Sequence, residues 1–309
     1  MAKASRLSIQ VTSLGFMERL RQNSFPAIYK GTARYTDKIS GEFTRPTGVA
    51  GKVPVMVIMH SSGGVSDAGT GAWSKYFLKM GIATFVVDSF NPRGFKSSAA
   101  DQSVLTDAGS VADALKALEA VAAIPDVDVN RIGVIGFSRG GNAALGSSYS
   151  KVKTGVLGEN SPLKFALHVG FYSGCVRTGT TDGTPLLVFE GGRDDYHSLK
   201  SCNTFADSLK AKGANLTYVT YPEATHGFDI DRKSVFAAKA QVWGACPRER
   251  LEDLDTLAVT IDGIKVPMRE YIAYSKECMT HGVNLEYNRV AAEDAKQRVE
   301  QFVRKYFAM

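Results

Sequence analysis

The feature that most restricts the fold of this 309-residue chain is an alternation of apolar runs with helical patterns over residues 53–222. The runs are rich in Val, Ile, Leu and Phe and do not alternate with polar residues, which is typical of strands buried on both faces. Strands that alternate with helices favour a parallel sheet with helices on both faces, so the sequence predicts an α/β fold. The predicted strands cover residues 53–59, 82–88, 131–137, 165–171, 185–191 and 215–222.

Helical patterns fill the intervals between these runs. In the segment 107–125, Val111, Leu115 and Leu118 recur on one face, and Pro125 ends the pattern. An amphipathic helix of this kind covers a sheet with its apolar face. The other predicted helices cover residues 71–81, 198–213 and 289–307.

The chain shows no internal repeat and no low-complexity linker, which favours a single domain over residues 1–309. Residues 1–26 are weakly patterned, and we expect them to form an N-terminal lead-in. The segment 227–285 departs from the strand–helix rhythm, and we expect an insertion that covers part of a site. Within it, residues 258–267 are predicted to form a hairpin around an Asp-Gly turn.

The net charge of +6 does not indicate nucleic-acid binding, because the 37 lysines and arginines are scattered rather than gathered in a basic block. No apolar run is long enough to span a bilayer. The four cysteines form no Cys-x-x-Cys pair, and no His or Cys stands at zinc-ligand spacing. The sequence therefore predicts a small-molecule substrate, no metal and no cofactor, and it leaves the oligomeric state open.

A tight corner joins the third apolar run to a helical pattern in "RIGVIGFSRGGNAAL", residues 131–145. Residues 136–140 match G-x-S-x-G, and a strand before and a helix after are the context that this motif requires. Such a corner holds the hydroxyl of Ser138 out at the carboxyl end of the sheet, where open α/β sheets bind ligands. The pattern predicts a nucleophile at Ser138; a simple tight turn is the alternative.

A serine hydroxyl is a weak nucleophile at neutral pH, so it needs a base, and the base needs an orienting acid. In this kind of sheet the expected chain order is Ser, Asp, His. Asp194 follows a predicted strand and a glycine pair, and His226 lies just past the next strand. We therefore predict Ser138, Asp194 and His226 as catalytic residues. Asp195 is the competing acid, and His168, inside a strand run, is predicted to lie in the core.

Two backbone N–H groups near Ser138 are predicted to stabilise a developing oxyanion. One is the N–H of Arg139, at the N-terminus of the following helix. The second is expected from the loop after the first central strand, "HSSGG" at residues 60–64, where glycines permit close backbone approach. The N–H of Ser61 is the candidate for this second donor.

These residues resemble the dienelactone hydrolase family of α/β-hydrolases. The resemblance rests on "HSSGG", "GFSRGG", "GGRDD" and "YPEATHGFD", and it covers about residues 50–230 and the final helix. It implies an α/β-hydrolase fold and a Ser- or Cys-His-Asp hydrolase that acts on esters or lactones. The family's founding members carry a cysteine nucleophile and a glutamate in the oxyanion strand, where this chain has Ser138 and His60. This departure points to a broader carboxylesterase.

The resemblance also implies a disulfide pattern. A cysteine after "FYSG" and a second one early in the helix after the acid are similar to a pattern in exported relatives, which implies a Cys175–Cys202 bond. Cys246–Cys278 is the hypothetical second bond. This pattern points to a periplasmic or secreted protein; a cytoplasmic location is the alternative, because the first residues lack the apolar stretch of a signal peptide.

Two further residues are candidates for substrate binding. His60 is one, and Arg93 is the other, because in the resembling family an arginine from this region meets a substrate carboxylate. An exposed turn arginine is the alternative for Arg93.

The predicted reaction is hydrolysis of a carboxylic ester or lactone through an acyl-enzyme on Ser138. An amidase, a peptidase or an acyltransferase on the same three residues is the alternative. A catalytically inactive binding protein is the remote alternative.

Overall fold

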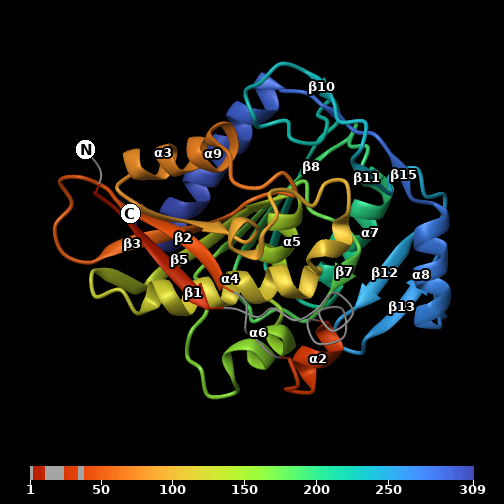
Figure 1. Ribbon diagram of the computed structural model, residues 1–309, viewed down its shortest axis with the longest axis horizontal. Coiled ribbons are helices and arrows are strands. Elements are labelled where there is room, and N and C mark those ends of the chain that lie inside the picture. Colours follow the sequence, from red (N-terminus) through yellow and green to blue (C-terminus); the bar gives the residue numbers. More distant parts are fainter. Residues whose placement is uncertain (1–2, 11–23, 34–37) are drawn as a thin grey trace.

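The computed structural model describes residues 3–10, 24–33 and 38–309, and its central feature is an eight-stranded sheet (Figure 1). β2 pairs antiparallel with β1 and with β4, and the six strands from β4 to β9 in sheet order run parallel. In sheet order the strands are β1 (Lys3–Gln10), β2 (Lys38–Arg45), β4 (Ala83–Asp88), β3 (Val53–Met59), β5 (Val127–Phe137), β6 (His168–Phe171), β8 (Leu186–Gly191) and β9 (Leu216–Tyr221).

The apolar runs of the sequence form the interior of this sheet. β3 pairs with β4 on one side and β5 on the other, and all seven of its residues are buried. A parallel strand in this position needs cover on both faces, which explains why its sequence does not alternate. The mostly parallel sheet predicted from the sequence is confirmed.

Helices cover both faces of the sheet and divide the core into two clusters. On one face, α4, α5 and α7 contribute Leu115, Leu145 and Phe205. On the other face, α3 and α9 contribute Phe77 and Val303, and Figure 1 shows these two helices above the sheet and α4 and α6 below it. The helices are α2 (Phe25–Tyr29), α3 (Ala72–Lys79), α4 (Asp107–Ala122), α5 (Arg139–Gly146), α6 (Ser150–Leu157), α7 (Leu199–Ala211), α8 (Met268–Glu277) and α9 (Arg289–Phe307).

Short-range signals set the ends of the main helices. The side-chain oxygens of Thr106, Ser198 and Asn288 accept backbone N–H bonds at the starts of α4, α7 and α9. Gly81 and Gly213 follow α3 and α7 with φ angles of 80° and 79°, a conformation that glycine adopts without strain. The four helices predicted from the sequence therefore all form.

The segment 227–285 builds a second, smaller layer at one end of the main sheet. Three of its strands join β7 in a four-stranded sheet in the order β14-β13-β12-β7, in which β12 pairs parallel with β7. The predicted hairpin is confirmed: β13 pairs with β14, and Asp262 and Gly263 take φ angles of 53° and 76° at the turn. Figure 1 shows α8, β12 and β13 together at this end of the molecule. The short strands are β7 (Arg177–Thr178), β10 (Val235–Phe236), β11 (Gln241–Val242), β12 (Arg250–Asp253), β13 (Ala258–Ile261), β14 (Ile264–Val266), β15 (Thr280–His281) and β16 (Asn284–Leu285).

The N-terminal residues contribute more to the sheet than their weak pattern indicates. β1 pairs with β2 along its whole length, from Lys3 opposite Arg45 to Gln10 opposite Lys38. Backbone hydrogen bonds make this pairing, and such bonds leave no mark on the side-chain pattern. Part of the lead-in expected over residues 1–26 is thus an edge strand, while residues 1–2 and 11–23 lie outside the described part of the chain.

Two disulfides join elements that are distant in the sequence. Cys175–Cys202 links the segment after β6 to α7, and Cys246–Cys278 links the segment before β12 to the end of α8. Both pairs implied by the resemblance are confirmed.

Among the residues with described positions, no helix has the length and apolar character needed to cross a bilayer.

Loss of the Cys175–Cys202 bond is expected to lower the free energy of unfolding by about 3–4 kcal/mol, because the bond restricts a loop in the unfolded chain. The double variant Cys175→Ala/Cys202→Ala, compared with the wild type in urea unfolding, measures this loss. Mass spectrometry of non-reduced peptides is the control that establishes the bond in the starting protein. An unchanged free energy of unfolding would contradict the prediction.

Candidate active site

Ser138 occupies a strained corner between β5 and α5. Its φ and ψ are 54° and −117°, a conformation that residues with a Cβ rarely adopt. The Ser138 N–H donates to the Phe171 carbonyl at 2.9 Å, and the Ser138 carbonyl accepts the Asn142 N–H at 3.0 Å. These bonds, to β6 on one side and within α5 on the other, hold the residue at the carboxyl end of the sheet.

The glycines on either side of this corner are required by contact between backbones. A Cβ on Gly136 would lie 1.9 Å from the Gly140 carbonyl oxygen. A Cβ on Gly140 would lie 2.2 Å from the Met59 carbonyl oxygen and 2.6 Å from that of His60. The start of α5 therefore packs directly against the end of β3. The motif read from the sequence has the strand–corner–helix geometry that it predicts.

His226 and Asp194 form a buried pair beyond the ends of β9 and β8. His226 Nδ1 lies 2.7 Å from Asp194 Oδ2, and their side chains are 7% and 2% exposed. Asp194 Oδ1 also accepts the Tyr196 N–H at 2.7 Å. An Nδ1–H donated to the carboxylate leaves Nε2 of His226 as the basic nitrogen. Asp195 points elsewhere, because its Oδ2 accepts the N–H and the side-chain amide of Asn284.

Two tyrosines enclose the imidazole of His226. Its ring centroid lies 4.2 Å from that of Tyr196 and 4.5 Å from that of Tyr172. Tyr172 is itself fixed, because its hydroxyl donates to Asp229 at 2.6 Å. In the described part of the chain, no hydrogen bond joins Ser138 to His226, so the structure directly connects two of the three predicted catalytic residues.

The loop after β3 is held by His60. Nδ1–H of His60 donates to the Ser61 carbonyl at 2.7 Å, and Nε2 accepts the Ser89 N–H at 3.1 Å. The ring is 4% exposed, packs against Phe90, and burial lowers its pKa. A neutral His60 thus ties the end of β3 to the end of β4. His60 does not line the cavity described below, and its contact with substrate stays a prediction.

Arg93 is also placed differently from the prediction. Its guanidinium makes two bonds to the Asp113 carboxylate, at 2.7 and 2.8 Å, and one to the Ser89 carbonyl at 2.8 Å. The side chains of the pair are 3% and 1% exposed. A buried charge needs such a partner, and this requirement holds Arg93 in the core and away from the cavity. The structure gives Arg93 a buried ion pair, and its expected contact with a substrate carboxylate stays a prediction.

The side chain of Arg139 supports the loop that precedes α4. Its guanidinium donates to the Leu105 carbonyl at 2.7 Å and to the Gln102 carbonyl at 2.9 Å. It lies 3.6 Å from Asp107 and is 7% exposed. Its backbone N–H, by contrast, is the first of α5 and lies directly after Ser138.

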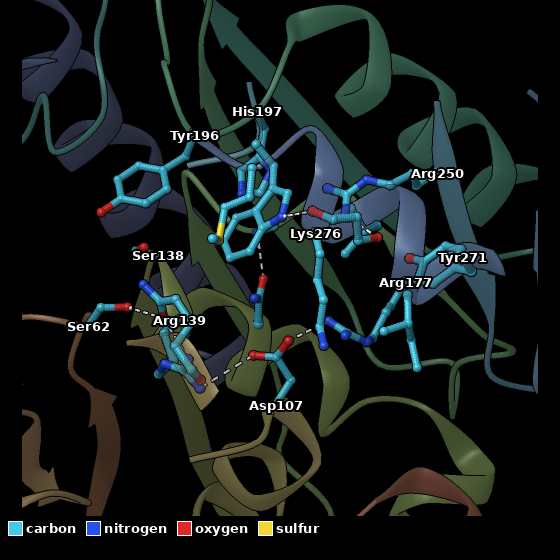
Figure 2. A pocket seen from close by; sticks show the side chains of 18 residues that line it. Ser62, Asp107, Ser138, Arg139, Arg177, Tyr196, His197, Arg250, Tyr271 and Lys276 are labelled. Atoms are coloured by element: carbon cyan, nitrogen blue, oxygen red, sulfur yellow. Dashed lines mark hydrogen bonds and ion pairs between the residues drawn. The ribbon is translucent and has the colours of Figure 1, made fainter. Parts of the chain in front are cut away.

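A cavity of about 300 Å³ opens beside Ser138. Its walls come from the strand ends of the main sheet and from the segment 227–285, so the insertion covers part of the site, as expected. Figure 2 shows Ser138 and Ser62 on one side and Arg177, Arg250 and Tyr271 on the other. The lining residues are Ser62, Gln102, Asp107, Ser138, Arg139, Asn142, Gly174, Val176, Arg177, Tyr196, His197, Trp243, Arg250, Tyr271, Ile272, Ser275, Lys276 and Met279.

Several of these residues were not predicted. Trp243, Arg250 and Tyr271 belong to the insertion, where no strand-end rule places side chains. His197 lines the cavity and is neutral near pH 7, because burial lowers its pKa to about 4. Of these lining residues, only Tyr196 and His197 could have been predicted from the sequence, because they directly follow Asp194.

One group of potential metal ligands occurs among the described residues. The ligand atoms of Cys175, Glu190 and Cys202 lie within 4.8 Å of one another. Both cysteines are in the disulfide and carry no thiolate, so the group lacks the ligands that a zinc site uses. Glu190 instead accepts the N–H and hydroxyl of Ser173, and burial raises its pKa well above the ordinary value.

Comparisons with known proteins identify the family of the chain and agree with its fold. A family model described as the dienelactone hydrolase family matches residues 39–248. A dienelactone hydrolase-like promiscuous phosphotriesterase from metagenomic libraries is 19% identical, covers 73% of this chain and 84% of its own, and has a TM-score of 0.53. A structure from Klebsiella pneumoniae is 18% identical, covers 74% and 90%, and has a TM-score of 0.52. No curated protein matches the chain significantly. The likeness between structures confirms the α/β-hydrolase fold.

His168 is confirmed as a core residue and has a pH-dependent consequence. It is fully buried, its Nδ1–H donates to the Ala144 carbonyl at 2.8 Å, and its Nε2 has no partner. A proton on Nε2 would be buried without an acceptor, and burial lowers the pKa of His168 to about 4.

The free energy of unfolding is therefore expected to fall as the pH drops from about 6.5 towards 4. Over this range His168 binds a proton in the unfolded chain but stays neutral in the folded protein. The variant His168→Asn keeps a donor for Ala144 without the titration. Between pH 7 and pH 5 the wild type should lose about 2 kcal/mol more than the variant in urea unfolding. Equal losses in the two proteins would show that His168 titrates normally.

Proposed function

The chain belongs to the dienelactone hydrolase family, and from this premise we propose that it is a serine hydrolase that cleaves a carboxylic ester or lactone through Ser138, His226 and Asp194. The observation that carries the proposal is the buried 2.7 Å contact of His226 with Asp194, taken together with the strained strand-end corner at Ser138. A serine at such a corner, served by an imidazole that a carboxylate orients, is the arrangement that activates a hydroxyl.

In the proposed reaction, Nε2 of His226 takes the proton of the Ser138 hydroxyl while Oγ attacks the carbonyl carbon. Asp194 accepts Nδ1–H of His226 and stabilises the imidazolium that forms. Collapse of the tetrahedral intermediate breaks the ester C–O bond, and the leaving alcohol takes the proton from Nε2. A water, deprotonated by Nε2, then attacks the acyl-enzyme and releases the acid and the Ser138 hydroxyl.

Proton transfer requires the Ser138 hydroxyl to come within about 2.6–3.2 Å of His226 Nε2. Catalytic hydrogen bonds are often longer before substrate binds than in the reacting complex. The Tyr196 ring lies against the imidazole and also lines the cavity, so a substrate that contacts Tyr196 would act directly on the position of the base.

We further propose the backbone N–H groups of Ser61 and Arg139 as the oxyanion donors. The close approach of α5 to the end of β3 supports this assignment, because a Cβ on Gly140 would touch the carbonyls of Met59 and His60. His60 fixes the same loop through the Ser61 carbonyl. Donors held in this way need no reorganisation when the oxyanion forms.

The two disulfides support a proposed location in the periplasm or outside the cell. Such bonds persist in oxidising compartments and are rare in the reducing cytosol.

A fluorophosphonate probe is expected to label the folded protein at Ser138, because only an activated serine reacts with it. The variant Ser138→Ala should remain unlabelled and should lose the hydrolysis of p-nitrophenyl esters. A chain-length series of these esters, measured beside the matching anilides, separates an esterase from an amidase. Labelling that survives in Ser138→Ala, or cleavage confined to anilides, would contradict the proposal.

The two neighbouring aspartates provide a matched pair of variants. Asp194→Asn should lower kcat by about 10³- to 10⁴-fold, because the amide cannot hold the imidazole in the productive tautomer. Asp195→Asn removes the same charge next to it but changes only bonds to Asn284, so kcat should stay within several-fold of the wild type. Both are read from the kinetics of a p-nitrophenyl ester. Similar losses in the two variants would overturn the assignment of Asp194.

A further inference from the structure

Tyr172 contacts the base of the proposed reaction without lining the cavity. Its ring centroid lies 4.5 Å from that of His226, and the residue is 1% exposed. Tyr196, the second ring against the imidazole, does line the cavity. A substrate can therefore touch Tyr196, whereas any effect of Tyr172 on the reaction passes through its protein neighbours.

A chain of hydrogen bonds fixes the hydroxyl end of Tyr172. Its Oη donates to Asp229 Oδ1 at 2.6 Å, and Trp73 Nε1 of α3 donates to Asp229 Oδ2 at 2.8 Å. Burial raises the pKa of Asp229 above its ordinary value, while these two donors act in the opposite direction. Asp229 thus accepts from two buried donors at once, and it follows His226 by three residues in the chain.

The backbone of Tyr172 is strained. Its φ is 37°, in the left-handed region that residues with a Cβ rarely adopt, and its N–H donates to the Phe189 carbonyl at 2.7 Å. The next residue, Ser173, donates its N–H and its hydroxyl to Oε1 of the buried Glu190, both at 3.0 Å. Strain of this kind persists only where the surrounding contacts over-determine it, and it clusters at functional sites.

The same short segment also holds the proposed nucleophile. The carbonyl of Phe171, directly before Tyr172, accepts the Ser138 N–H at 2.9 Å. Two consecutive residues after the middle of β6 thus contact Ser138 and His226, which share no hydrogen bond within the described ranges. This segment is therefore a direct structural connection between the nucleophile and the base.

We propose that Tyr172 is a positioning residue, which keeps the imidazole of His226 in the orientation from which Nε2 reaches the Ser138 hydroxyl. The bond to Asp194 fixes the imidazole at one atom, so the imidazole could still swing about that bond. A locked ring packed against the imidazole removes this freedom. The inference rests on the proposed function, because it adds a residue that serves the same base.

Tyr172→Phe is the principal test, because it keeps the ring and deletes the bond to Asp229. With a p-nitrophenyl ester, kcat should fall by about 5- to 50-fold, because a catalytic group displaced by about 1 Å can cost about 100-fold. KM should stay within about twofold, because Tyr172 does not line the cavity and a slower His226 retards acylation and deacylation together.

Tyr76→Phe is the matched control. Tyr76 of α3 packs against the core cluster that contains Tyr172, and its hydroxyl also donates to a carboxylate, Glu300 Oε2, at 2.6 Å. Among the described residues no ring contact joins Tyr76 to His226, so kcat should stay within about twofold of the wild type. Equal losses of kcat in the two variants would show a general effect of packing and would overturn the inference.

A double-mutant cycle tests whether Asp229 acts through the Tyr172 hydroxyl. Asp229→Ala alone should lower kcat about as much as Tyr172→Phe. Added to Tyr172→Phe, it should lower kcat by no more than about twofold further, because the bond between the two side chains is already lost. Losses that multiply would contradict the proposed chain. Where one of the two variants does not fold, the other alone carries the measurement of kcat and KM.

Two readouts do not depend on turnover. The rate at which a fluorophosphonate labels Ser138 should fall in Tyr172→Phe by about the same factor as kcat, and it should not change in Tyr76→Phe. In the proton NMR spectrum, the Nδ1–H of His226 that is bonded to Asp194 should exchange with water faster in Tyr172→Phe than in Tyr76→Phe or the wild type. Unchanged labelling and unchanged exchange in Tyr172→Phe would overturn the inference.

Failure of the inference and failure of the proposed function give different results. Ester hydrolysis through Ser138 with equal kcat in the wild type and Tyr172→Phe would overturn the inference and leave the function intact. Absence of both ester cleavage and labelling, together with faster exchange of the His226 Nδ1–H in Tyr172→Phe, would overturn the function. Tyr172 would then still be the residue that holds His226 in place.

Discussion

The contact between the start of α5 and the end of β3 is the constraint on which the site depends. Gly136 and Gly140 leave no room for a side chain, and the backbone of Ser138 is strained in consequence of the sharp turn between them. The strain is tolerated because β3, β5 and β6 surround the corner with paired backbone. With the corner fixed, Ser138 lines the cavity together with Ser62 of the loop after β3. Asp194 and His226 follow β8 and β9 at the carboxyl edge of the sheet, because all of these strands are parallel.

The sequence predicted the parts of the molecule that follow from this parallel order. Six apolar runs became six sheet strands, and the G-x-S-x-G corner and the strand-end positions of Asp194 and His226 needed only the rule that parallel strands end at one edge. The choice between Asp194 and Asp195 needed coordinates, because adjacent residues after a strand point in different directions. The edge strand β1 was missed because only backbone pairing makes it.

The sequence was least informative about the partners of charged and polar side chains in loops. Arg93 and His60 were expected to face substrate, yet each satisfies a buried partner: Asp113 for one, and the backbone at Ser61 and Ser89 for the other. A loop sequence states which charges are present but not which of them find a counter-charge inside the protein. Tertiary contacts decide this: Arg93 pairs with Asp113 in the core, whereas among the described residues no carboxylate pairs with Arg250 in the cavity.

The main sheet and the segment 227–285 form different walls of the cavity. Ser138, Asp194 and His226 follow strands of the main sheet, whose parallel order places all three at its carboxyl edge. The segment 227–285 is bonded to the residues after β8, because the Gly244 N–H donates to the Asp195 carbonyl and Asn284 donates to the Asp195 carboxylate. β12 pairs with β7, and the Cys246–Cys278 bond joins the segment before β12 to the end of α8, so this wall of the cavity is tied to the rest of the protein at several points and not only at its two ends.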